Sequence, residues 1–347
     1  MRKILSLLAL LMLICPGAQA LTLPYPEDTV LSVMQVTDAQ RALAEALYNP
    51  VFNHVDTIPL PEGTRYGDVA PAMHLLMQDY PELFHLGQSF TVSYYRSAPE
   101  TAVSVTPQYR MSKEEAAAIR TELYVTAYLL ADANPDPLAL HDALCAMVTY
   151  GGDTDSRHTA AGALLEGRAT CEGYAQALSL LYRMAGIPCG TVLGTAQSAP
   201  GTGEPHAWNI ARLNDCTLID PTWNDQNSLA LCTHWYYGLS TGQMGADHTP
   251  GENQAVPPCD EQDNFHLRQG LLISTLDEAD TALRRLCEGE TVNLRFTDDT
   301  LYRQLADDSF GFINAFNKRN PDAAFRGTYS MIRSDAQRCV ILQRTEE

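Results

Sequence analysis

The chain has 347 residues, of which 45% are apolar, and its formal net charge at pH 7 is −19. A chain of this length and composition can bury sizeable cores, which excludes intrinsic disorder and a dependence on disulfides as starting assumptions. The strong negative charge argues against nucleic acid and anionic membrane surfaces as partners.

The first 20 residues have the features of a secretory signal peptide. Basic residues at positions 2 and 3 precede an apolar run to Ile14, and the small residues within 18–20 resemble a cleavage site. The apolar run has about half of the roughly 20 residues that a bilayer-spanning helix requires. We therefore expect residues 1–20 to be removed, leaving a secreted, extracellular protein without membrane insertion.

Residues 21–110 are expected to form an α/β module at the N-terminus. Helical periodicity predicts two helices, and alternation predicts two strands that form a hairpin. The expected elements are helices over 39–47 and 69–79 and strands over 89–95 and 102–106, with a loop at 59–67.

Residues 111–262 are expected to form the central domain. Ser112 and Glu115 have the capping-box spacing that begins a helix, which we expect to reach Asp132. Two more helices and three short strands follow, at 138–149, 171–185, 190–196, 207–213 and 218–220. Helices followed by antiparallel strands are typical of an α+β fold.

Residues 263–347 are expected to form a small α/β module at the C-terminus. Its predicted elements are helices over 276–287 and 300–307 and strands over 291–296 and 339–343. The sequence of this module contains no cluster that suggests chemistry, and the chain as a whole contains no internal repeat.

Cys171 is predicted to be the first residue of a helix. Apolar residues at 174, 177, 178, 181 and 185 follow it with helical spacing, and Gly186 ends the run. The N-terminus of a helix and a neighbouring protonated histidine both stabilise a thiolate, which is the reactive form of cysteine. Cys171 is therefore a candidate nucleophile that needs a histidine partner.

His206 and Asp220 are the candidate partners of that cysteine. His206 opens a predicted strand after a glycine-rich segment, whereas most of the nine histidines lie on predicted helix surfaces or in loops. Asp220 ends the next strand, where a carboxylate can fix the imidazole tautomer. Because side chains alternate along strands, the two residues share a face only if the turn near Asn214 has an odd number of residues or a bulge. The alternative is a structural capping role for Asp220 ahead of Pro221.

Three motifs follow one another around the three candidate residues: Ala169-Thr170-Cys171-Glu172-Gly173-Tyr174-Ala175, His206-Ala207-Trp208-Asn209 and Ile219-Asp220-Pro221-Thr222-Trp223-Asn224-Asp225. In their order and separation they resemble the motifs of bacterial secreted transglutaminase-like domains. The likeness extends to residues 80–84, 235–237 and 247–248, so it covers most of the chain after the signal peptide. It implies an α+β, papain-like core of helices packed on an antiparallel sheet, flanked by the two α/β modules.

The resemblance implies a catalytic triad in which Cys171 is the nucleophile, His206 the general base and then acid, and Asp220 the orienting acceptor. The reaction would be amide acyl transfer through a thioester. Hydrolysis of peptide or isopeptide amides and transglutaminase crosslinking both begin in this way, and we favour hydrolysis. The expected partner is a protein or cell-wall peptide substrate, and no cofactor is expected. The alternative is a catalytically silent binding module at the cell surface.

Four further residues are expected to line the substrate cleft or to pack beside it: Tyr150, Glu172, Trp208 and Trp223. Tyr150 resembles a family tyrosine near the site. The chain departs from the family in the hairpin before the catalytic aspartate, where residues 214–218 replace a glycine and a Trp-Tyr pair. This departure alters the turn and the cleft wall rather than the triad.

Seven cysteines remain outside the signal peptide and the triad, and an exported protein can join them in disulfides. Pairing of Cys232 with Cys259, or of Cys287 with Cys339, is suggested by neighbourhood only, because spacing does not determine connectivity. The sequence has no Cys-x2-Cys pair and no close Cys/His cluster, so no metal site is expected.

Overall fold

The structure is a computed structural model that describes residues 23–96, 100–152, 154–198, 201–226, 231–260 and 264–345. The expected signal peptide lies outside the described residues. The chain forms two compact units. The first unit comprises the described residues up to Leu213 with Asp220–Thr222 and Thr249–Pro257; the second comprises Asn214–Ile219, Trp223–His248 and the residues from Pro258 onward.

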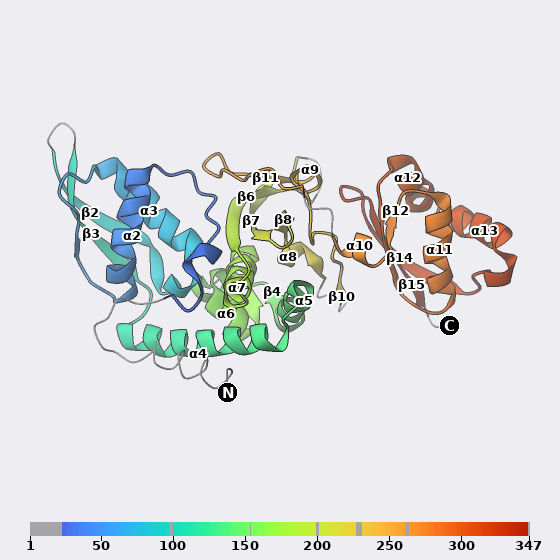
Figure 1. The fold of residues 1–347 in the computed structure, drawn as a ribbon, viewed down its shortest axis with the longest axis horizontal. Helices are drawn as coiled ribbons and strands as arrows, with labels where there is room; N and C mark the ends of the chain where they lie inside the picture. The colour runs from blue at the N-terminus through green and yellow to red at the C-terminus, as the bar shows by residue number, and fades with distance from the viewer. Residues whose placement is uncertain are drawn as a thin grey trace. The chain divides into compact units, whose positions relative to one another are not determined.

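The N-terminal part of the first unit packs two helices on a small antiparallel sheet (Figure 1). Its elements are η1 (Glu27–Thr29), α2 (Asp38–Phe52), β1 (Ile58–Pro59), α3 (Tyr66–Asp79), η2 (Pro81–Leu83), β2 (Leu86–Tyr95) and β3 (Thr101–Tyr109). The strand order is β1-β3-β2. A capping box of Thr37 and Gln40 begins α2. The core between helices and sheet includes Leu47, Val51, Val69, Met73, Leu76 and Val105.

Four helices make up the next part of the first unit. The elements are α4 (Lys113–Ala133), α5 (Pro137–Met147), β4 (Thr149–Tyr150), η3 (Asp155–His158), α6 (Ala160–Glu166), β5 (Arg168–Ala169) and α7 (Cys171–Met184). The sequence did not predict α6, because its seven residues between the cap at Thr159 and the left-handed Gly167 are too few to show a period. Among the described residues, no helix combines the length and apolarity needed to cross a bilayer.

Strands β6 (Cys189–Ala196) and β7 (Glu204–Arg212) follow in the first unit and pair antiparallel. Their register places Gly194 opposite His206. Helix α7 packs against both strands and buries apolar side chains such as Leu178 and Leu181. The predicted α+β fold, with helices on an antiparallel sheet, is confirmed.

The second unit is built mainly on a mixed sheet of order β12-β13-β15-β14, in which only the β12–β13 pair is parallel. Helices α11 and α12 pack on this sheet (Figure 1). The sequence did not predict α13 or β14; Gly311 and the asparagines weaken the helical signal of α13. The elements are β8 (Cys216–Ile219), β9 (Asp225–Gln226), β10 (Leu231–Cys232), α9 (Thr241–Met244), α10 (Phe265–Arg268), β12 (Leu272–Ile273), α11 (Leu276–Cys287), β13 (Val292–Phe296), α12 (Asp299–Asp307), α13 (Ser309–Arg319), η5 (Pro321–Ala323), β14 (Thr328–Ser334) and β15 (Cys339–Thr345). Helix α8 (Pro221–Asn224) and strand β11 (His248–Pro250) contain residues of both units.

Buried polar contacts tie the C-terminal sheet to the segment 233–248 within the second unit. Trp235 Nε1 donates to Asn293 Oδ1 at 3.0 Å, and Asn293 Nδ2 donates to the carbonyl of Thr233 at 2.6 Å. Gln337 Nε2 donates to both carboxylate oxygens of Asp247, at 3.4 and 3.3 Å. These contacts make the C-terminal sheet and this segment one compact body.

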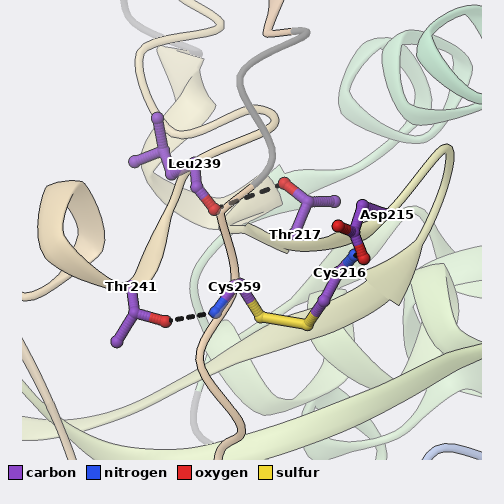
Figure 2. Close-up of a disulfide and its surroundings, with 6 residues drawn as sticks. All are labelled: Asp215, Cys216, Thr217, Leu239, Thr241 and Cys259. Carbon is purple, nitrogen blue, oxygen red and sulfur yellow. Dashed lines mark hydrogen bonds between the residues drawn. A yellow bond between two sulfur atoms is a disulfide. The ribbon is translucent and has the colours of Figure 1, made fainter.

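A disulfide joins Cys216 to Cys259 within the second unit (Figure 2). Hydrogen bonds flank it: Thr217 Oγ1 donates to the carbonyl of Leu239, and the Cys259 amide donates to Thr241 Oγ1. The suggested pairings of Cys232 with Cys259 and of Cys287 with Cys339 are therefore wrong, since Cys259 is bonded to Cys216 and the other three cysteines are not in a disulfide. Tertiary contacts between β8 and the 239–241 segment, rather than proximity in sequence, bring the bonded pair together.

Replacement of Cys216 by serine is expected to destabilise the protein by about 4 kcal/mol, because the bridge closes a loop with a sequence separation of 43. The measurement is the melting temperature of the wild type and of Cys216→Ser, each with and without a reductant. The reductant should lower the melting temperature of the wild type and leave that of Cys216→Ser unchanged. Cys287→Ser is the control, because Cys287 belongs to the same unit and is not in a disulfide. Equal melting temperatures for wild type and Cys216→Ser would contradict the prediction.

Candidate active site

Cys171 is half-buried and is the first residue of α7. The chain leading into it is fixed by neighbouring backbone: the amide of Thr170 donates to the carbonyl of Arg157 at 2.9 Å. Gly173 permits this approach, because a Cβ there would lie 2.3 Å from the same Arg157 carbonyl oxygen. The packing of the preceding loop thus holds the thiol at the helix N-terminus, where the helix dipole favours a negative charge.

His206 and Asp220 lie in direct contact. His206 Nε2 is 2.7 Å from Asp220 Oδ2, and both side chains are nearly or completely buried. Asp220 Oδ1 accepts a hydrogen bond from the backbone amide of Thr222 at 2.9 Å, which orients the carboxylate. Strand β7 ends at Arg212 and β8 begins at Cys216, so the intervening turn has three residues, the odd number that a shared face requires.

Cys171 is close enough to His206 to act on the pKa of the imidazole, which is in contact with Asp220. Burial acts to lower the pKa of His206, but the charge and hydrogen bond of Asp220, followed by those of Cys171, raise it from 6.5 to about 10. The imidazole is therefore protonated at neutral pH. Because Nε2 is engaged by Asp220, Nδ1 is the ring nitrogen available to the sulfur.

Tyr150 lies near Cys171 on the parallel pair of β4 with β5, in which it is the partner of Ala169. The side chain is exposed toward solvent. Burial of part of the ring and the charges of Cys171, Glu204 and Asp220 raise the pKa of the Tyr150 hydroxyl, so it remains a neutral donor at neutral pH. An exposed phenol beside the thiol can contact a bound substrate.

Glu172 contacts His158, one of the histidines that the sequence predicts to lie on a helix surface or in a loop. Glu172 Oε2 lies 3.2 Å from His158 Nδ1, and Thr170 Oγ1 lies 3.2 Å from the same nitrogen. Both the carboxylate and the imidazole are about one-third exposed. No local pattern pointed to His158, because its partners are 12 and 14 residues away in sequence.

The two tryptophans have different surroundings. Trp208 is fully buried, and its ring lies nearly parallel to that of His206 with the centroids 6.3 Å apart. Trp223 is half-buried and makes edge contacts with Tyr236 and His248 within the second unit. Trp208 thus supports the imidazole by packing, while Trp223 belongs to an aromatic cluster.

Substitution of Gly194 by alanine is expected to destabilise the protein by about 1–3 kcal/mol through overpacking. The added Cβ would lie 2.7 Å from the ring of Trp208 and 2.2 Å from the carbonyl oxygen of Thr249. Thermal unfolding measures the effect. Gly203→Ala is the matched control, since its nearest contact is Gln197 Cγ at 3.7 Å. Equal melting temperatures for the two variants would contradict the prediction, because they would show that the backbone of β6 can shift to accommodate the added Cβ.

Comparison with known proteins gives the following matches. Residues 125–221 match the family model of the transglutaminase-like superfamily. A crystal structure of a TGase is 16% identical, with 40% of this chain and 45% of that one covered and a TM-score of 0.27. The periplasmic domain of TgpA from Pseudomonas aeruginosa, bound to ethylmercury, is 17% identical, with 38% of this chain and 59% of that one covered and a TM-score of 0.25. The chain therefore spans about half the length of these solved structures. No curated protein matches the chain.

Proposed function

Because this chain carries a domain of the transglutaminase-like superfamily at residues 125–221, we propose that it is a cysteine-dependent enzyme that transfers the acyl group of an amide through a thioester. The observation that carries this proposal is the contact of His206 with Asp220, together with the interaction of the same imidazole with Cys171 at the start of α7. The catalytic reaction that we favour is hydrolysis of peptide or isopeptide amides.

In the first half of the reaction, the Cys171 thiolate attacks the amide carbonyl carbon and forms a carbon–sulfur bond. The carbonyl electron pair moves to oxygen, and the oxyanion forms near the start of α7. The backbone N–H of Cys171 has no acceptor within its helix, so it is available to the oxyanion. A preorganised donor of this kind lowers a barrier by about 2.7–4 kcal/mol.

His206 then acts as the general acid. Its proton passes to the departing nitrogen, the carbon–nitrogen bond breaks, and the acyl group remains on sulfur as a thioester. Water or an amine attacks this thioester with His206 as the base, which regenerates the thiolate. Asp220 holds the imidazole in one tautomer and stabilises its charged form.

We also propose that the protein acts outside the cytoplasm. The support for this location is the disulfide between Cys216 and Cys259, because disulfides persist in oxidising compartments, together with the sequence features of residues 1–20.

The proposal is tested with a library of peptides and isopeptides, incubated with and without an added primary amine. We expect the wild type, and not Cys171→Ala, to release ammonia or an amine. Product masses identify the second step, since a free acid results from water and an adduct results from the amine. Equal background release by the two proteins would instead favour the catalytically silent binding module.

A further inference from the structure

A cavity of about 340 Å³ lies within the first unit, beside the start of α7. Helix α3, the segment around η2, strand β2 and helix α7 all contribute to its wall. Much of this wall is apolar, from Met34, Met77, Leu83, Phe84, Leu86 and Leu193. A chain of methylene groups bound there would be removed from water, which is favourable.

The cavity adjoins the candidate active site through α7, because its lining includes Glu172, which directly follows Cys171. The lining also includes Leu193 of β6, the strand that pairs with the strand of His206. Since successive residues of a helix point about 100° apart, the cavity lies next to the attacking sulfur rather than in line with it. A residue that flanks the scissile amide can therefore reach it.

The lining contains a buried hydrogen-bond acceptor that is free. Gln176 is 4% exposed, and its Nε2 donates to the carbonyls of Met77 and Gln78 at 3.2 and 3.1 Å. Those two bonds fix the orientation of the amide. Gln176 Oε1 has no hydrogen-bond partner among the described residues. Because a buried acceptor without a donor is costly, this oxygen favours a ligand that brings an N–H group.

Glu172 adds a second acceptor one helical turn before Gln176. Residues four apart lie on the same face of a helix, so both side chains line the same cavity. The basic groups in the lining are Arg110, His74 and His158. Arg110 Nη1 donates to the carbonyl of Asp155 at 2.9 Å and Nε lies 3.7 Å from its carboxylate, and His158 Nδ1 lies 3.2 Å from Glu172 Oε2. Glu172 is the one carboxylate among these lining residues, so it is the acidic group that a cation bound in the cavity would meet.

We propose that this cavity is a specificity subsite for a residue that flanks the scissile amide and whose side chain is aliphatic along its length and ends in a protonated nitrogen, as that of lysine does. This inference rests on the proposed function, because it assigns the cavity to the substrate of that same site. The net charge of −19 agrees with it, since an acidic protein attracts a cationic substrate.

The binding experiment uses the Cys171→Ala protein, which holds peptides without turning them over. Matched peptides carry lysine, norleucine or glutamate in turn at the positions on either side of the amide, and calorimetry measures each Kd. We expect the lysine peptide to bind about 10-fold or more tightly than the norleucine peptide, which lacks only the charged donor. The glutamate peptide should bind more weakly still.

Two further substitutions, made in the Cys171→Ala protein, test whether the preference for lysine arises in this cavity. Glu172→Gln should reduce the preference for lysine over norleucine by about 10-fold, since it removes the charge of the acceptor. Met77→Trp should weaken the binding of both peptides, because the larger ring fills the cavity. Glu114→Gln is the matched control: it removes an exposed carboxylate in the first turn of α4 and should leave the preference unchanged.

Failure of the subsite and failure of the proposed function give different results. Equal binding of the lysine and norleucine peptides, or an equal loss of preference in Glu172→Gln and Glu114→Gln, would overturn the subsite. Turnover of peptides by the wild type without a lysine preference would also overturn it and leave the enzyme proposal standing. A lysine preference in binding without any turnover would support the subsite and contradict the enzyme proposal.

Discussion

Replacement of Cys171 by serine is expected to lower kcat/KM for amide turnover by about 10⁴-fold or more. The sulfur can act as a thiolate beside the protonated His206, whereas a serine hydroxyl in the same place keeps its proton at neutral pH. The measurement is steady-state turnover of a peptide selected from the library, combined with mass spectrometry of the quenched protein.

The mass of the quenched protein separates loss of the nucleophile from loss of the fold. Wild type should gain the mass of the acyl group, and Cys171→Ser should not, although its melting temperature stays close to that of the wild type. Cys287→Ser is the control, because it removes another half-buried thiol, from the second unit. Acylation of Cys171→Ser at the wild-type rate would rule out the thioester mechanism.

Substitution of Asp220 by asparagine is expected to lower kcat by about 10⁴-fold, the size of loss that follows when the orienting acceptor of a triad histidine is removed. An asparagine oxygen can still accept the hydrogen bond that the Thr222 amide donates, so the local backbone is retained. Its amide group would then face His206 Nε2 and favour the wrong tautomer. Unchanged thermal unfolding together with the loss of kcat is the expected combination.

The pH profile gives an independent readout of the same substitution. Burial opposes the charged imidazole, and Asp220 is the main group that overcomes this effect and raises the pKa of His206 to about 10. The protonated form, which supplies a proton to the leaving amine, is present below that pKa and is lost as the pH rises through it. In Asp220→Asn the alkaline fall in amine release should therefore move to lower pH. An alkaline limb at the same pH in both proteins would show that His206 is not the proton donor.

Local signals in the sequence predicted most of the elements that frame the candidate site. The spacing of Ser112 and Glu115 predicted the start of α4, which begins with that capping box. The apolar period after Cys171 predicted α7, and a glycine at 186 predicted its end. These signals act within a few residues, because caps and amphipathic faces depend on neighbours one or two turns apart.

The contacts across the candidate site were harder to predict. The sequence left open whether His206 and Asp220 share a face, since that depended on the length of one turn. The contact of Glu172 with His158 was not predicted, and the pairing of Cys216 with Cys259 replaced the suggested pairings. Residues 14 to 43 apart meet only after the chain has folded, so no local period records them.

By itself the sequence determined the helix that begins at Cys171, the strand that begins near His206 and the α+β class, because helix caps and hydrophobic periods are properties of short segments. Only the tertiary structure decided that one imidazole interacts with both a thiol and a carboxylate, and that a cavity with the free acceptor of Gln176 lies beside them. The physical reason is that burial and hydrogen bonding between distant segments depend on how helices and strands pack, and many sequences with the same local pattern would pack differently.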